Sequence, residues 1–278
     1  MNVGVSSWAF RWAVGSPDAL PTRPLDAVGL LEKAAGLGAE VVQVCDNVPI
    51  DLLDQEQLGR LSSRAEMLGV ELELGVRGAS TERLRGEIES ARRLRVRLLR
   101  VVLGEHGGKP PSLEEHLDVV RALLPDLRRS GVTLAIENHF GLTPQELARL
   151  VETIDDPLVG ICLDPLNSIS RLVGPRETVR LLAPHAVSIH AKDAVVRRQQ
   201  TGFYVAGCPL GEGLVDIVGM LEEVRRAGRS PNLLVEAWMD PLQDEAATLA
   251  AEESMIREGI AYLRGLAGTA APAKGRKR

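Results

Sequence analysis

The sequence predicts a single α/β domain of the (β/α)8 class, a TIM barrel, on three observations. The chain has 278 residues, and a barrel of eight strand–helix units needs about 250 residues. Apolar strand-like runs alternate with helix-length segments eight times, which is typical of a parallel sheet with right-handed crossovers. The last four runs each end in a potential ligand, and in this fold the carboxyl ends of the strands form the pocket floor.

The first half of the chain predicts four strands and four helices. Gly38 and Gly69 stand where the first two helices need a C-terminal cap. Leu84 and Ile88 recur at helical spacing in an Arg-rich segment, so we expect its charges to form a solvated face. In chain order the elements are strand 3–6, helix 25–37, strand 40–44, helix 54–68, strand 70–74, helix 81–95, strand 97–103 and helix 112–129.

The second half predicts the other four strands. The apolar run that starts at Val132 leads straight into Glu137, Asn138 and His139. The connection over 191–213 has no strand or helix pattern, and its length favours a lid or a binding loop. In chain order the elements are strand 132–136, a helix that begins with a Thr143–Glu146 capping box, a strand that ends at Asp164, strand 186–189, helix 214–227, strand 232–235 and helix 243–266.

Two regions follow from this pattern. Residues 1–267 are predicted to form the catalytic barrel, and residues 268–278, rich in alanine, glycine and basic residues, to form a disordered tail. His116 lies inside the fourth predicted helix, and we expect it on the surface.

Composition excludes several classes of protein. A net charge of -5 and a pI near 5.7 provide no basic footprint for nucleic acid. The three cysteines form no Cys-x-x-Cys pair, and Cys45 and Cys162 are predicted to be buried, inert thiols. The N-terminus lacks the pattern of a signal peptide, and no apolar run reaches the roughly 18 residues of a membrane span. We therefore expect a cytoplasmic protein with no membrane or nucleic-acid partner.

Four strand ends carry residues that suit a metal site: Glu137, Asp164, His190 and Glu236. Three converging carboxylates without a cation would repel one another, so either their pKa values rise or a metal binds. Three oxygen ligands with one imidazole suit one divalent ion, with Mn2+ the first choice and Mg2+, Co2+ or Zn2+ as alternatives. The plainer interpretation is that each acidic residue caps a helix or a strand end.

Five fragments carry a resemblance to a known family: Ile136–His139, Leu163–Ser168, Ile189–Asp193, Gly211–Asp216 and Val235–Glu236. In this order and spacing the chain resembles the xylose isomerase-like TIM barrels, or sugar phosphate isomerases/epimerases. The resemblance implies that Glu137, Asp164, His190 and Glu236 bind one metal and that Glu137 and Glu236 are the acid/base pair. The implied reaction is isomerisation or epimerisation of a sugar by proton transfer next to a carbonyl, through a metal-stabilised enediolate.

Seven further residues are candidates for substrate contact. Lys192 follows a predicted ligand and could hold a substrate oxygen, and the plainer interpretation is a surface ion pair with Asp193. Aromatic residues near the N-terminus could form an apolar wall or fill the barrel rim. The candidates are Trp8, Arg11, His106, His139, Asn167, Lys192 and Arg197.

Three other functions stay open. A lyase of the inosose or dehydroshikimate dehydratase type would use the same metal and base. DNA repair of the endonuclease IV type would need three zinc ions, and Asn167 stands where such enzymes place a histidine ligand. A non-catalytic binding barrel would hold a small sugar derivative without turnover, and a homo-oligomer is compatible with any of these.

Overall fold

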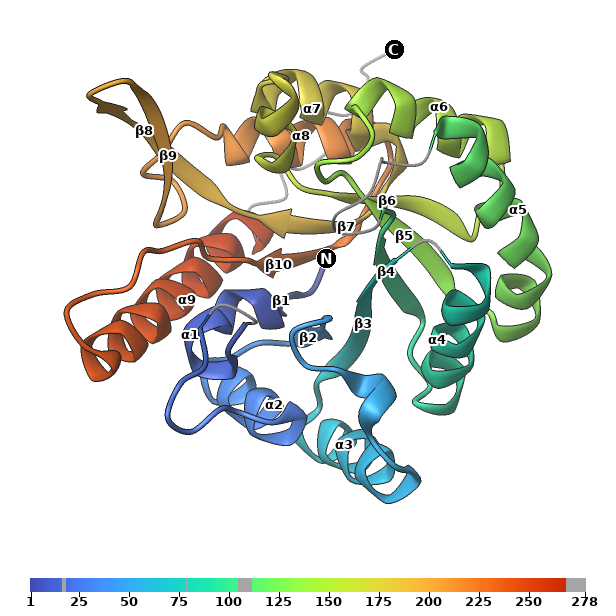
Figure 1. The fold of residues 1–278 in the computed structure, drawn as a ribbon, viewed down its shortest axis with the longest axis horizontal. Helices are drawn as coiled ribbons and strands as arrows, with labels where there is room; N and C mark the ends of the chain where they lie inside the picture. Colours follow the sequence, from blue (N-terminus) through green and yellow to red (C-terminus); the bar gives the residue numbers. More distant parts are fainter. Residues whose placement is uncertain (17–18, 79, 105–111, 269–278) are drawn as a thin grey trace, which may run out of the picture.

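The computed structural model describes residues 1–16, 19–78, 80–104 and 112–268 and confirms the TIM barrel (Figure 1). Parallel strands close in the order β1-β10-β7-β6-β5-β4-β3-β2. The strands are β1 (Val3–Ser6), β2 (Val41–Val44), β3 (Glu71–Arg77), β4 (Leu98–Val102), β5 (Thr133–Glu137), β6 (Val159–Leu163), β7 (Ala186–Ala191) and β10 (Asn232–Val235). The eight predicted strands are therefore all present, because β-branched and leucine-rich runs were the signal for each.

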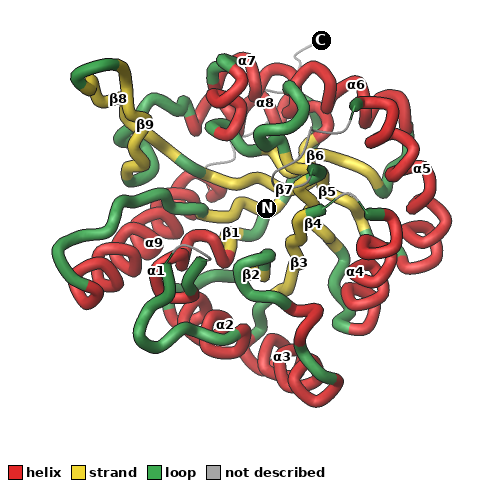
Figure 2. Tube along the Cα trace, in the orientation of Figure 1, coloured by secondary structure: helices red, strands yellow, loops and turns green. Residues whose placement is uncertain are grey.

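Helices surround the barrel on its outside (Figure 2). The predicted capping boxes at Ser112 and Thr143 both form, and Gly69 has the left-handed conformation expected after a helix. The helices are α1 (Arg11–Val14), α2 (Ala27–Gly36), α3 (Gln55–Leu68), α4 (Thr81–Arg93), α5 (Leu113–Ser130), α6 (Pro144–Ile154), α7 (Pro175–Leu182), α8 (Ile217–Arg226) and α9 (Glu245–Gly268). No helix in these described ranges is long and apolar enough to cross a bilayer.

Strand order brings the predicted ligands together. The strands β5, β6, β7 and β10 are neighbours in the barrel, and they are parallel to one another. Glu137 lies opposite Cys162 in the β5–β6 pair, and His190 lies opposite Leu234 in the β7–β10 pair. The four ligand-bearing strand ends therefore lie on one side of the barrel mouth.

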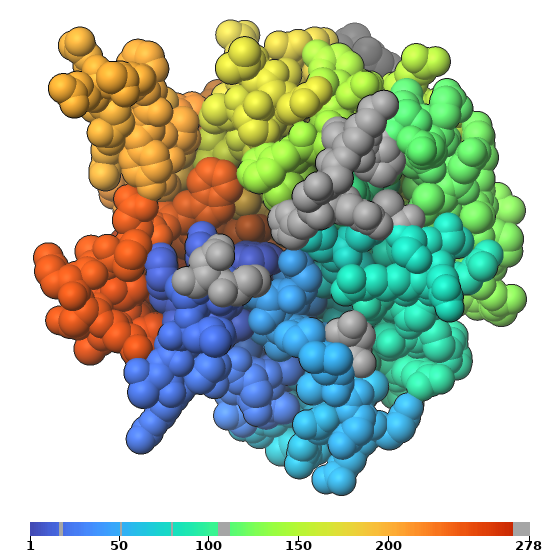
Figure 3. Space-filling view, viewed as in Figure 1, coloured from blue at the N-terminus to red at the C-terminus, as the bar shows by residue number. Residues whose placement is uncertain are grey.

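The connection after β7 differs from the prediction of a segment without secondary structure. Strands β8 (Asp193–Gln199) and β9 (Gly202–Cys208) form an antiparallel hairpin that stands out from the body of the molecule (Figure 3). The prediction was wrong because the runs Ala194–Val196 and Phe203–Val205, which suit strands, flank a turn at Gln200 and Thr201.

His116 is buried rather than exposed, and its Nδ1 lies 2.9 Å from the carbonyl oxygen of Ser112. It faces inward because its position continues the buried stripe of α5 that includes Leu117 and Val120. Gly268 is the last residue of α9, and residues 269–278 of the predicted tail lie outside the described residues.

The barrel interior contains polar side chains where bulky branched residues usually pack. Gln43, Glu73, Arg100 and His190 are all buried there. Gly75 makes room for this layer, because a Cβ atom at that position would lie 2.6 Å from Cys45 Sγ and 3.3 Å from Arg100 Cδ. Buried polar groups need hydrogen-bond partners. These four residues therefore form a buried polar layer beneath the site.

Candidate active site

Three of the four predicted ligands converge on one point. Asp164, His190 and Glu236 each offer one ligand atom, and these atoms lie within 4.8 Å of one another. His190 Nδ1 is 2.5 Å from Glu236 Oε2. Asn138 fixes the strand end that carries Asp164, because its side chain accepts a hydrogen bond from the Asp164 N–H and donates one to the Asp164 carbonyl oxygen.

The donor atoms of this cluster suit a cation. Within the described part of the chain, Asp164 Oδ2, His190 Nδ1 and Glu236 Oε2 are buried and make no hydrogen bond of good geometry, although Asp164 Oδ2 pairs with Lys192 Nζ at 2.7 Å and the other two atoms lie 2.5 Å apart. Such atoms are costly to bury unless an ion or a proton satisfies them. A set of two carboxylate oxygens and one imidazole nitrogen fits Mn2+, Mg2+, Co2+ or Zn2+, so these three residues fit the predicted divalent metal.

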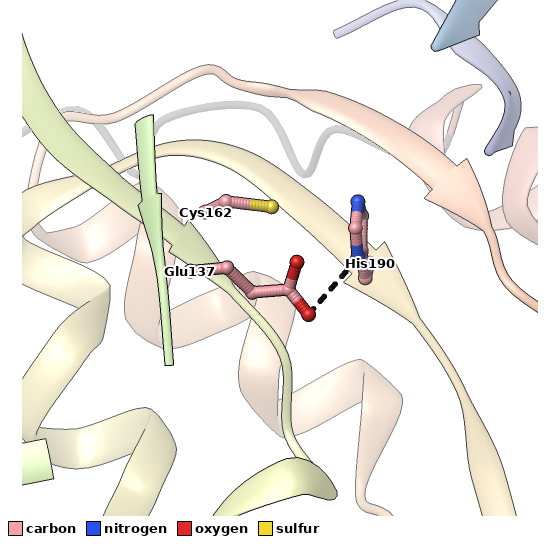
Figure 4. A group of neighbouring side chains, drawn as sticks. All are labelled: Glu137, Cys162 and His190. Atoms are coloured by element: carbon pink, nitrogen blue, oxygen red, sulfur yellow. Dashed lines mark ion pairs between the residues drawn. The ribbon is translucent and has the colours of Figure 1, made fainter. Parts of the chain in front are cut away.

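Glu137 reaches the same region but is held by other groups. Its Oε1 lies 3.6 Å from His190 Nδ1 (Figure 4) and accepts a 2.8 Å hydrogen bond from Asn167 Nδ2. Its Oε2 accepts a hydrogen bond from Arg100 Nε. Cys162 completes a second potential ligand group with Glu137 and His190. The predicted fourth ligand therefore contacts the cluster while both of its oxygens are engaged.

Lys192 is part of the site and not a surface ion pair. Its Nζ forms ion pairs with Asp164 Oδ2 at 2.7 Å and with Glu236 Oε1 at 3.0 Å, and it stands over the Trp238 ring at 4.5 Å from the centroid. Asp193 has another task, because its carboxylate accepts hydrogen bonds from four backbone N–H groups, those of Ala194, Gly211, Gly213 and Val215. It thus fixes the chain that follows the hairpin.

The electrostatics of the site combine burial with strong pairing. Burial raises the pKa of Asp164, opposed by Lys192. Burial acts in the same direction on Glu236, but His190 and Lys192 outweigh it and lower its pKa to about 2. Burial opposes the charged form of His190, yet neighbouring Cys162, Glu236 and Glu137 raise its pKa well above the usual value. The potential at His190 Nδ1 therefore strongly favours a positive charge, whether a proton or a metal ion.

Arg100 has a comparable effect on Glu137. Burial alone would raise the pKa of this carboxyl, but the Arg100 guanidinium, followed by His190 and Lys192, holds it well below its usual range. Glu137 is consequently an ionised and poorly basic carboxylate.

The other predicted substrate contacts lie at different positions in the chain's fold. His139 lies beside the mouth, with Nε2 3.5 Å from Arg77 Nη2, and burial lowers its pKa to about 4. Trp8 and Arg11 line a cavity of about 190 Å3 that also contacts Glu236. Arg197 is exposed on the hairpin, opposite Tyr204. His106 lies outside the described residues.

Sequence reasoning missed three residues of the site: Gln43, Glu73 and Arg100. Gln43 and Arg100 are each the only polar residue of their strand, and Glu73 is the one fully buried charged residue of β3, whose other two, Glu71 and Arg77, lie at its ends. The pattern could have revealed them, because a lone polar residue in a fully buried parallel strand needs a buried partner.

One wall of the cavity depends on a buried carboxylate from α9. Glu252 accepts hydrogen bonds from the backbone N–H groups of Trp12 and Ala13, at 2.6 and 3.1 Å. Burial raises its pKa from 4.5 to about 7, opposed by these two hydrogen bonds. Because this pKa is raised in the folded state, the stabilisation linked to the proton is complete below pH 4.5 and is lost as the pH rises through about 7.

We expect Glu252→Gln to remove this pH dependence. The free energy of unfolding of the wild type, minus that of the variant, should fall by on the order of 2 to 3 kcal/mol between pH 5 and pH 8. Urea unfolding at both pH values measures it, and Glu253→Gln, at the neighbouring position that pairs with Lys33, is the control. A difference that stays constant or rises with pH would refute the role of Glu252.

Comparisons with known proteins agree with this geometry. The chain matches the family described as xylose isomerase-like TIM barrel over residues 31–266. It is 34% identical over 265 residues to 3-oxo-isoapionate decarboxylase of Pectobacterium atrosepticum, with 95% of each chain covered.

Solved structures show the same fold at lower identity. D-psicose 3-epimerase with D-tagatose, from Clostridium cellulolyticum H10, is 16% identical, with a TM-score of 0.71 over 96% of this chain and 99% of that chain. IOLI protein with a bound zinc atom is 16% identical, with a TM-score of 0.72 over 95% and 98%. The family match and the curated relative both extend over most of the sequence, and this chain belongs to the xylose isomerase-like TIM barrel family.

Proposed function

We propose that this chain is a divalent metal-dependent enzyme that decarboxylates a small 3-oxo sugar acid. The observation that carries the proposal is the buried arrangement of Arg100, Glu137 and Asn167, in which both Glu137 oxygens are engaged. Epimerisation needs Glu137 to remove a proton from carbon, and its lowered pKa makes it a weak base. Decarboxylation needs no such proton removal, because the leaving group is CO2.

The relative that is 34% identical over 95% of the chain supports the same reaction class, since its name is 3-oxo-isoapionate decarboxylase. One fold hosts many reactions, so the fold alone does not identify the reaction. The site and this relative agree on chemistry next to a carbonyl group.

Three residues would hold the metal: Asp164, His190 and Glu236. A divalent ion bound there supplies a Lewis acid that polarises a substrate carbonyl. Glu137 serves as a fixed negative charge that keeps Arg100 in place, and Asn167 holds it in one orientation. The site is buried, so its charges act with little screening by water.

The chemical step balances without an oxidant or a reductant. The bond between the carboxylate carbon and its neighbour breaks, CO2 leaves, and the electron pair remains on the substrate as an enolate. We assign Lys192 to stabilise the enolate oxygen, since Nζ is a buried ammonium close to Glu236. Burial opposes its charge, but Asp164, Glu236 and Glu137 outweigh burial and raise its pKa. Solvent supplies the proton that is added to the carbon, and Lys192 stays protonated throughout.

The pocket beside the metal ligands suits a small, polar substrate. Trp8 and Trp238 provide apolar surface, and Arg11 provides a cation in the same cavity of about 190 Å3. We assign Arg11 to a substrate carboxylate or hydroxyl group. His139 and Asn167 are placed at the mouth and beside Glu137 respectively, and we retain them as contacts, with Arg197 as a contact from the hairpin.

A sugar isomerase or epimerase is the second candidate. The convergence of Glu137 and Glu236 on His190 favours it, because two carboxylates around one centre are what inversion at carbon requires. It demands that substrate binding release Glu137 from Arg100.

The test is to load the chain with Mn2+ and to offer it 3-oxo-isoapionate, D-tagatose and D-allulose in D2O. We expect CO2 release from the 3-oxo acid, with one deuterium at the carbon that loses the carboxylate, and no change in the ketoses. Lys192→Met should lower kcat by at least about a hundredfold, because the cation that stabilises the enolate oxygen is lost. Arg198→Met, on the exposed part of the hairpin, is the control.

Other outcomes identify the other functions. Deuterium uptake and epimer formation from a ketose, without CO2, would establish the isomerase. Enone absorbance from a keto-inositol would establish a dehydratase-type lyase. Cleavage of DNA at abasic sites would establish repair of the endonuclease IV type, and binding without turnover would establish a non-catalytic barrel.

A further inference from the structure

A chain of buried hydrogen bonds leads away from His190 into the barrel. His190 Nε2 lies 2.8 Å from Gln43 Oε1. The Gln43 amide Nε2 donates a 2.9 Å hydrogen bond to Glu73 Oε2. Asn232 Nδ2 donates a 2.9 Å hydrogen bond to Glu73 Oε1. Gln43, Glu73 and His190 are each at most 1% exposed, so water does not compete with these bonds.

The chain fixes which way the Gln43 amide points. In the flipped orientation, the amide oxygen would face the Glu73 carboxylate. Two hydrogen-bond acceptors would then be buried against each other. Cys45 also favours the observed orientation, because its thiol donates a 3.3 Å hydrogen bond to Gln43 Oε1. Glu73 itself is held on both oxygens by donors. The amide oxygen is therefore directed at His190.

We propose that Gln43, oriented by Glu73, is a positioning residue that fixes the proton of His190 on Nε2 and so presents Nδ1 to the metal. The inference rests on the metal site proposed above. The opposite ring nitrogen agrees with it, since Nδ1 is buried, makes no hydrogen bond of good geometry among the described residues and lies beside Glu236 Oε2. A neutral histidine has one donor nitrogen and one acceptor nitrogen. Because Gln43 Oε1 is an acceptor, Nε2 is the donor and Nδ1 is the acceptor.

This arrangement has a direct consequence for affinity. Groups that bind the other nitrogen of a metal-ligating histidine set its orientation and its basicity, and their loss usually costs about 10- to 100-fold in metal affinity. Neither Gln43 nor Glu73 belongs to the proposed ligand set, and both come from strands on the other side of the barrel, β2 and β3. The metal site therefore depends on strands that carry no predicted ligand.

The network allows a sharp test by exchange of the two residues. Gln43→Glu alone places two carboxylates next to each other, and Glu73→Gln alone leaves one amide N–H group facing another donor. The double exchange Gln43→Glu with Glu73→Gln restores every donor and acceptor, since the relocated carboxylate accepts from His190 and the relocated amide oxygen accepts from Asn232. We expect each single variant to bind Zn2+ about 10- to 100-fold more weakly and the double variant to recover most of the affinity.

Two measurements give the readout. Competition with a chromophoric chelator reports the Zn2+ affinity of each full-length variant. Nitrogen-15 NMR of the Zn2+-loaded wild type, with His190→Asn to assign one of the five histidines, reports which ring nitrogen carries the proton. Ser188→Ala is the control, because this buried hydroxyl lies on the same strand as His190 and has no hydrogen-bond partner in the described chain.

The proton is expected on Nε2, and Ser188→Ala should bind Zn2+ like the wild type. A proton on Nδ1 overturns the proposal, as does a double exchange that binds no better than the worse single variant. If the variants bind Zn2+ with affinities in the expected order but the chain does not decarboxylate the 3-oxo acid, only the proposed function is wrong. A proton on Nδ1 in an active decarboxylase removes the role of Gln43 alone.

Discussion

Replacing Asp164 with asparagine is expected to abolish stoichiometric metal binding and to lower kcat/KM for decarboxylation by at least about a thousandfold, or about 4 kcal/mol. The substitution removes the charge of a carboxylate whose Oδ2 faces the cluster. It keeps the shape, and Oδ1 can still accept the backbone N–H groups of Leu166 and Asn167, at 2.8 and 2.9 Å. The variant should therefore fold, and the loss should be one of binding and chemistry.

Asp156→Asn provides a matched control for this result. Asp156 is also a buried aspartate that accepts a backbone N–H, that of Leu158, but it precedes β6 whereas Asp164 follows it. In the control, the metal content after dialysis, measured by elemental analysis, and kcat/KM should both be unchanged. If Asp164→Asn retains one equivalent of metal with wild-type affinity, the assignment of Asp164 as a ligand is wrong.

The second large effect concerns Arg100. Arg100→Met is expected to lower the free energy of unfolding by about 3 to 5 kcal/mol, because removing one partner leaves buried charge uncompensated. Arg100 is 2% exposed and pairs with Glu137 and with Asp46, at 3.2 Å in the latter case. Urea denaturation followed by circular dichroism measures the loss.

Two further variants separate charge from packing. Arg92→Met removes an exposed arginine that pairs with Glu89, and should cost less than about 1 kcal/mol. Arg100→Met combined with Glu137→Gln removes both charges and should recover part of the stability. If the loss of unfolding free energy in the double variant equals the sum of the losses in the two single variants, Arg100 and Glu137 are not coupled.

The barrel could be predicted from the sequence because its signal is periodic and local. Eight apolar runs, with caps such as Ser112 and Gly69 between them, define strands and helices without knowledge of tertiary contacts. The hairpin after β7 was missed because a short two-stranded ribbon carries a weak signal beside charged residues such as Arg197 and Arg198.

The convergence of the proposed ligands could be predicted because they follow strands, whereas the residues that support them could not. Asp164, His190 and Glu236 stand at the ends of neighbouring strands, and the topology of a barrel brings such ends together. Arg100, Gln43 and Glu73 lie within strands, and only the closed barrel places them against Glu137 and His190. The sequence therefore indicated which polar residues meet at the barrel mouth but not which residues control their charge and orientation.

The comparisons show the family and the fold, and they do not identify the reaction of this chain. The solved structures show the fold, since their identities are 18% or lower, whereas the decarboxylase of Pectobacterium atrosepticum is related along nearly the whole chain. The engaged state of Glu137 is an independent reason to favour loss of CO2 over proton abstraction.

The most direct test of the central claim is anomalous diffraction from crystals of the wild-type chain soaked in Mn2+. The proposed site predicts one anomalous peak within bonding distance of Asp164 Oδ2, His190 Nδ1 and Glu236 Oε2, at about 2.0 to 2.3 Å. It also predicts that the peak disappears in Asp164→Asn crystals. An absence of density at this point, or a peak bound by other residues, would contradict the metal site and the mechanism built on it.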